Sequence, residues 1–201
     1  MKNDLELETR KRTTVPRDRR DFLTTACLLA PICGLADHGP QGRTQGKHTS
    51  TVALPVEARV DRALRQFGMG FHCAQSVLEV YAADFGIDPM MARRIANPLA
   101  GGSGVGGECG AVASAYLILG LRHGNTTPAF GDVVEEAVLF GRISQFVTEF
   151  KKRNGAINCR ELLGVDLFTK EGIDEALRKN LFAIRCQAYI QDAIEILEAL
   201  G

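Results

Sequence analysis

The chain has 201 residues, of which 45% are hydrophobic and 24% are charged, as in an ordinary soluble globular protein. Its 24 Lys and Arg residues balance its 24 Asp and Glu residues, which argues against nucleic-acid binding through bulk positive charge. The absence of Trp disfavours a base-stacking surface, and no apolar run reaches the ~18 residues of a membrane-spanning helix. We therefore expect neither a nucleic-acid partner nor an integral membrane span.

Residues 1–36 are predicted to be a twin-arginine-type export signal. A basic stretch ends in the pair Arg19-Arg20, and an apolar run with small residues near its end follows, which is the order of an export signal. The alternative is a frayed amphipathic N-terminus that contains an accidental Arg pair. Residues 37–55, rich in Gly, Thr, Gln and Pro, read as a linker. We expect a periplasmic or otherwise extracytoplasmic protein, exported in the folded state.

The remaining residues, 56–201, have helical rather than strand periodicity, and we predict an all-α bundle of five to seven helices with a glycine-rich loop. A helix is expected near Val60 to Phe67, and Gly68 and Gly70 break it from the next. The other expected helices cover residues 71–85, 89–97, 110–121, 128–153, a segment that starts near the N-cap Asn158, and 181–200.

The glycine-rich loop, residues 101–107, matches the pattern G-x-G-x-x-G of dinucleotide-binding proteins. That motif requires a preceding strand and an acidic residue about twenty positions later. The preceding segment reads as helical, and residues 125–130 contain no acid. We therefore reject the nucleotide hypothesis and expect the glycines to permit a close approach or a sharp turn.

Four cysteines lie in the helical region, and no C-x-x-C pair occurs among them: Cys73, Cys109, Cys159 and Cys186. Cys73 and Cys186 lie in apolar rows that predict inward-facing positions. Cys109 and Cys159 are expected at helix starts, where the helix dipole favours the thiolate. We predict that the four thiols converge in the core. Chemically idle core cysteines and two structural disulfides are the alternatives.

The cysteines and their flanking residues resemble the C_GCAxxG_C_C family, whose members are described as redox-active. The matching segments are FHCAQSV (71–77), the glycines and ECGAV of residues 101–112, CRELLG (159–164) and Cys186. The family also looks related to the non-haem domain of split-Soret cytochromes. Ser114 departs from the final Gly of the family motif, and the missing C-x-x-C-H means that covalent haem is not implied.

The resemblance implies that Cys73, Cys109, Cys159 and Cys186 ligate one iron–sulfur cluster, a [2Fe–2S] cluster being the expected type. We further expect backbone N–H groups of Gly106, Gly107 and Gly110 to bind cluster sulfurs. Residues 56–201 would then be a four-cysteine electron-transfer domain with an unidentified redox partner protein, rather than a stand-alone enzyme with catalytic residues.

Two other functions remain open at this point: a thiol–disulfide redox protein that uses the same cysteines, and an interaction module stabilised by zinc. A homodimer is also an option, because small residues in residues 110–115 let helices pack closely.

Overall fold

The computed structural model describes residues 54–125 and 133–201, which all belong to one unit of the chain, Gln45–Gly201. The predicted signal, residues 1–36, lies outside the described residues. So does the predicted linker, residues 37–55, except for its last two positions.

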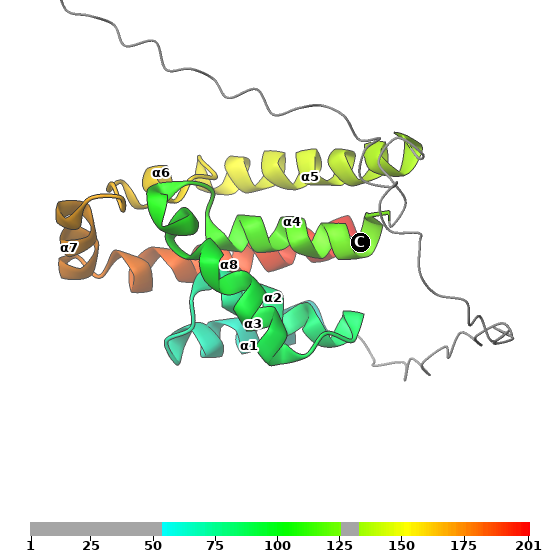
Figure 1. Cartoon of the computed structure of the whole chain (residues 1–201), viewed down its shortest axis with the longest axis horizontal. Helices are drawn as coiled ribbons and strands as arrows, with labels where there is room; N and C mark the ends of the chain where they lie inside the picture. Colours follow the sequence, from blue (N-terminus) through cyan, green and yellow to red (C-terminus); the bar gives the residue numbers. More distant parts are fainter. Residues whose placement is uncertain (1–53, 126–132) are drawn as a thin grey trace, which may run out of the picture. The chain divides into compact units, whose positions relative to one another are not determined.

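The described residues form eight α-helices and no strand, which confirms the all-α class (Figure 1). Their bounds are α1 (Val56–Gly68), α2 (Cys73–Ala82), α3 (Pro89–Ala96), α4 (Gly110–His123), α5 (Val133–Asn154), α6 (Cys159–Leu163), α7 (Lys170–Arg178) and α8 (Leu181–Leu200). The number of helices exceeds the predicted five to seven because α7 was not predicted. Its apolar residues Ile173, Ala176 and Leu177 follow the i, i+3, i+4 spacing of one helical face, and this short row is the signal that the prediction missed.

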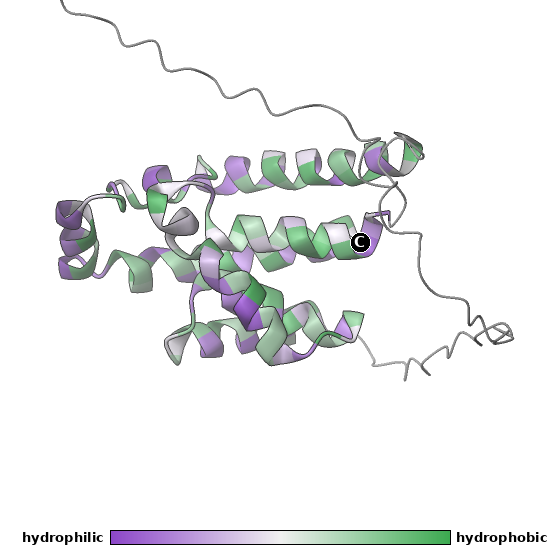
Figure 2. Cartoon of the chain, in the orientation of Figure 1, coloured by the Kyte–Doolittle hydropathy of each residue, from purple (hydrophilic) through white to green (hydrophobic). Residues whose placement is uncertain are grey.

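Helix α2 lies at the centre of the packing, against α1, α3 and α4, while α8 packs against α1, α4 and α5. Nine of the ten residues of α2 are buried, as expected of a helix surrounded by other helices. Figure 2 shows that α4 is predominantly hydrophobic, whereas α7 is largely hydrophilic. Small residues of α4, including Ala111 and Ala115, are fully buried and allow α2 and α4 to approach closely.

Local signals explain where several helices begin and end. Pro89 occupies the first turn of α3, and the side chain of Asp88 caps this helix by accepting a hydrogen bond from the Met91 amide at 3.0 Å. Gly86, in the left-handed conformation, ends the short η1 helix (Ala83–Phe85) that continues α2. Helix α8 covers Leu181–Leu200, as predicted.

A buried polar network joins the C-terminal ends of α2, α4 and α8. Arg59 is 1% exposed, donates to the carbonyl oxygen of Val80 at 2.8 Å and pairs with Asp84 at 2.5 Å. The hydroxyl of Tyr81 and the guanidinium of Arg122 donate to Glu198 at 2.8 and 2.9 Å. Because these charges are paired in the core, they fix the helix ends relative to one another.

Candidate redox site at the four cysteines

Cys73 and Cys109 lie against each other where α2 and α4 begin. Cys73 is the first residue of α2, and Cys109 is the N-cap of α4. Both are buried, and their thiols are hydrogen-bonded. Gly110 makes this contact possible, since a Cβ atom at this position would lie 2.9 Å from Cys73 Sγ and 2.9 Å from the Ala74 Cβ.

The environment of Cys73 favours its thiolate. The hydrogen bond with the Cys109 thiol lowers the pKa of Cys73 despite its burial, and the amides of Ala74, Ala111 and Gly110 act in the same direction. The pKa of Cys109 is raised, first by its hydrogen bond with Cys73 and then by burial. One thiol of the pair is therefore prepared to carry negative charge, while its neighbour holds the proton.

Cys159 is brought to this pair by a short antiparallel bridge between Glu108 and Asn158. In this bridge, the amide of Cys109 donates to the carbonyl oxygen of Ile157 at 2.7 Å. The amide of Cys159 donates to the carbonyl oxygen of Gly107, also at 2.7 Å. Cys159 thus becomes the first residue of α6 and is buried, with 5% of its surface exposed.

Cys186 completes the set from the second turn of α8. It is 6% exposed and starts the buried row that continues through Ile190 and Ala193, as the sequence predicts. Tyr189, one turn further along α8, donates its hydroxyl to the carbonyl oxygen of Leu162 in α6 at 2.9 Å. This bond ties the helix that carries Cys186 to the helix that carries Cys159.

The remaining two thiols favour their protonated forms in the metal-free chain. Burial, followed by the negative charge at Cys73, raises the pKa of Cys159 to about 12. Burial also raises the pKa of Cys186, and the charges at Cys73 and Cys159 add to this effect. Negative charge on any one thiol therefore opposes it on the others, which is the behaviour of groups gathered in one place.

The structure places three of the four cysteines at helix starts, one more than predicted. Cys73 was expected on an inward helix face, and it is both buried and the first residue of α2. The periodic row through Val77 indicated burial but not the position of the helix boundary. The signal that identifies the boundary is His72, whose amide donates to Gln75 Oε1 at 3.0 Å.

The three glycines expected to serve cluster sulfurs behave differently. The amide of Gly110 acts to lower the pKa of Cys73, and a Cβ atom on Gly110 would lie 2.9 Å from Cys73 Sγ. The amide of Gly107 donates to the carbonyl oxygen of Gly102 at 3.0 Å. Gly106 packs beside the side chain of Arg160, where a Cβ atom would lie 3.1 Å from the Arg160 Cβ. The role of these glycines toward a cluster stays a prediction.

The glycines also close a tight turn, as the sequence indicates. Residues Gly102–Gly106 form the turn η3, in which a Cβ atom on Gly102 would lie 2.4 Å from the amide nitrogen of Gly107. Only glycine is tolerated at position 102, because its φ is positive and the backbone of Gly107 occupies the space that a side chain would need. Glu108 and Cys109 follow shortly after this turn in the chain.

The thiols do not form a preformed site for a single metal ion. Within the described residues, no group of three or more His, Cys, Asp or Glu side chains is placed to hold one ion. A structural zinc ion requires four ligands at about 2.0–2.3 Å. A two-iron cluster distributes the same four thiols over two metal atoms, so its demands on sulfur spacing differ.

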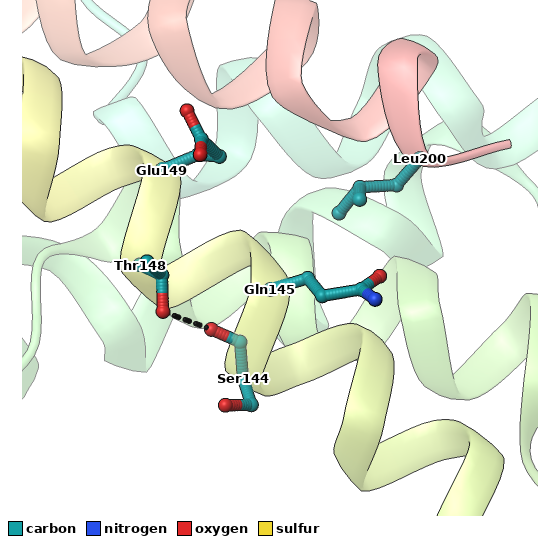
Figure 3. A pocket seen from close by; sticks show the side chains of 5 residues that line it. All are labelled: Ser144, Gln145, Thr148, Glu149 and Leu200. Atoms are coloured by element: carbon teal, nitrogen blue, oxygen red, sulfur yellow. Dashed lines mark hydrogen bonds between the residues drawn. The ribbon is translucent and has the colours of Figure 1, made fainter.

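A pocket elsewhere on the chain is a poorer candidate for a site. It lies between α5 and the end of α8, has a volume of about 310 Å³, and is lined by Ser144, Gln145, Thr148, Glu149 and Leu200 (Figure 3). The hydrogen bond drawn there runs from Thr148 to the backbone of Ser144, one turn earlier in α5. It is a contact within a helix and leaves no group of side chains directed at a ligand.

In the part of the chain that the structure describes, fold and site together define an all-helical protein with four buried, free cysteines, three of which lie where helices begin. The family model described as "Putative redox-active protein (C_GCAxxG_C_C)" matches residues 71–200. The chain belongs to this family, as the residues around its cysteines predict. No curated protein and no solved structure matches the chain. In the part of the chain that the structure describes, no helix is both long and apolar enough to cross a membrane.

Proposed function

We propose that the chain is an exported electron-transfer protein that holds one iron–sulfur cluster, of the [2Fe–2S] type, on Cys73, Cys109, Cys159 and Cys186. The observation that carries this proposal is the gathering of four buried free thiols, three from the starts of α2, α4 and α6 and one from the second turn of α8. When bound, such a cluster takes up and releases one electron at a time.

The donor set fits this group in three respects. All four proposed ligands are thiols, the groups that most iron–sulfur clusters bind, and they come from four different helices, α2, α4, α6 and α8. Amides of Ala74, Gly110 and Ala111 direct partial positive charge at the sulfur of Cys73, which supports a thiolate ligand. Burial excludes water and would protect the sulfurs from oxidation.

The predicted export signal supports the same proposal from an independent direction. A twin-arginine route carries proteins that are already folded, and an iron–sulfur cluster is assembled before export. Four cysteines that served only as disulfides would not require such a route, because a disulfide protein is oxidised after it crosses.

A second candidate, thiol–disulfide exchange, is favoured by one specific observation. Cys73 and Cys109 are hydrogen-bonded to each other, and Cys73 has the lowered pKa of an attacking thiol. In that function, Cys73 would attack a disulfide of a partner, and Cys109 would resolve the mixed disulfide by displacing the partner's thiol.

The decisive experiment is an absorption spectrum, with iron and acid-labile sulfide analysis, of the full chain purified without oxygen. Visible charge-transfer bands and equal amounts of iron and sulfide are expected. A colourless, iron-free protein that stays so after reconstitution would reject the cluster. Thiol counting with and without reductant would then separate the disulfide function from a zinc-stabilised module.

A further inference from the structure

An apolar groove of about 610 Å³ opens beside the cysteines, between the end of α1, the glycine turn, α7 and the start of α8. Its walls carry the three rings of Phe67, Phe71 and Phe182. Leu177 of α7 also lines it and is 63% exposed. The volume falls within the range of ordinary small-molecule sites, and exposed apolar side chains of this kind mark binding surfaces.

Several residues that line the groove are close in the chain to the cysteines. His72 lines it and directly precedes Cys73, while Ala183 lines it and precedes Cys186 by three residues on the same face of α8. Ala100 also lines it and follows Leu99, whose carbonyl oxygen lies against Gly110 beside Cys73 Sγ. A molecule in the groove would therefore lie next to the cysteine-bearing segments.

The polarity of the groove restricts what it can hold. Among the described residues that line it, none is Asp, Glu, Lys or Arg, so no permanently charged side chain there would balance the charge of a phosphate or carboxylate. Two lining side chains, His72 and Asn180, can donate N–H hydrogen bonds to an uncharged oxygen. Gly101 and Gly104 contribute backbone without side chains, which leaves one wall open to a flat ring.

We infer that this groove binds an uncharged quinone ring. Such a ring is planar and apolar, its oxygens accept hydrogen bonds, and aromatic side chains pack favourably against it. The choice of a redox-active ring rests on the proposed electron-transfer function. The shape and polarity of the groove are independent of that function. Flavin nucleotides and nicotinamide dinucleotides are disfavoured because their phosphates would find no cation among the lining residues.

A second apolar groove supplies the control. It has a volume of about 350 Å³, lies along α3 and α4, and includes Leu121, which is 44% exposed. It is lined by other helices than those that carry Cys159 and Cys186. An acidic substitution at Leu121 therefore tests for general apolar binding without altering the groove beside the thiols.

The test is equilibrium dialysis of the full chain against duroquinone, whose ring is fully substituted and so resists addition of thiols. We expect saturable binding of one molecule per chain. Leu177→Asp should weaken binding about tenfold or more, because it places a charge in an apolar wall, while Leu121→Asp should leave binding unchanged. Circular dichroism melting should show both variants folded, since both positions are exposed.

Absence of saturable binding, or an equal loss in both variants, would overturn the inference. The same dialysis on chain with and without iron and sulfide separates the two proposals. Binding by iron-free chain that cannot be reconstituted would support the groove and reject the cluster. A loaded cluster without binding would support the cluster and reject the groove.

Discussion

The hydroxyl of Ser114 donates a hydrogen bond to the carbonyl oxygen of Ala74 at 2.9 Å, across the contact between α4 and α2. Both residues are fully buried, and Ala74 directly follows Cys73. The small side chain of Ser114 fits between the helices and finds an acceptor there.

Removal of this hydroxyl should loosen the contact next to Cys73. Ser114→Ala is expected to lower the free energy of unfolding by about 1 kcal/mol, a typical net value for one hydrogen bond, which corresponds to roughly 2–4 °C in Tm. Ser114→Gly should cost about 1 kcal/mol more because glycine disfavours the helix interior. Thermal melting of the three proteins measures both steps, and equal Tm values would contradict the assigned role.

Gly110→Ala should damage the site directly. The new methyl group would meet Cys73 Sγ and the Ala74 Cβ at 2.9 Å and the Leu99 carbonyl oxygen at 3.0 Å, so α4 must shift away from α2. We expect a loss of about 1–3 kcal/mol in stability and a lower iron content after reconstitution. Gly120→Ala is the matched control, because no atom lies within 4 Å of its Cβ and it belongs to the same helix.

The control should be neutral or stabilise the protein by up to about 1 kcal/mol, since alanine favours the helix. A Gly110→Ala protein with the stability and iron content of Gly120→Ala would refute the close approach of α2 and α4 at Cys73.

Serine substitution of each cysteine distinguishes the proposed functions. Ligation of one cluster predicts that Cys73→Ser, Cys109→Ser, Cys159→Ser and Cys186→Ser each lose most of the visible absorption and iron. Disulfide exchange predicts instead that the variants fail in two pairs. Cys27→Ser, outside the helical domain, should retain the cofactor, and any loss there would point to a role for the N-terminal cysteines.

The lowered pKa of Cys73 predicts which thiol reacts first in reduced, metal-free chain. A lower pKa gives a larger thiolate fraction at a given pH, and only the thiolate attacks iodoacetamide. Labelling of Cys73 should therefore begin at a lower pH than that of Cys159, whose pKa is about 12, or Cys186. The burial of these thiols is similar, so it does not itself favour Cys73.

Peptide mapping by mass spectrometry after timed labelling between pH 6 and pH 9 measures this order. Earlier modification of Cys159 or Cys186 would show that the Cys73–Cys109 hydrogen bond does not control reactivity in solution.

Arg59→Met should destabilise the fold without touching the cysteines. It removes a guanidinium that is 1% exposed and leaves Asp84 and Glu198 without this partner. We expect a loss of roughly 2–4 kcal/mol, somewhat below the value for a fully buried pair because both carboxylates are partly exposed. Arg94→Met, at an exposed position of α3, should change the stability by less than about 0.5 kcal/mol in urea unfolding.

The sequence predicts those features that repeat along one helix. The row from Cys186 through Ile190 and Ala193 marks both the inward face and the extent of α8, and Pro89 marks the start of α3. Burial of the thiols follows from the same periodicity. Such patterns contain the information because each residue contacts neighbours three and four positions away.

Contacts between distant segments produce no periodic pattern in the sequence. The pairing of Glu108 with Asn158 joins two loops that show no period, and the burial of Arg59 and Glu79 depends on partners in other helices. The acceptor of the Gly107 amide is likewise set by the turn that begins at Gly102, which no periodic pattern in the sequence indicates. A single sequence therefore identifies the cysteines but not the hydrogen bonds that position them.

The Glu108–Asn158 bridge also bears on the order of folding. It joins the segment before α4 to the segment before α6. Cys186 belongs to α8, the last helix. The four thiols are therefore brought together by contacts between parts far apart in the chain. Contacts of this kind form late, after the entropy of closing long loops has been overcome. A nascent chain that lacks α8 would have an incomplete ligand set. Under the proposed function, loading of a cofactor would therefore report that the whole domain has folded.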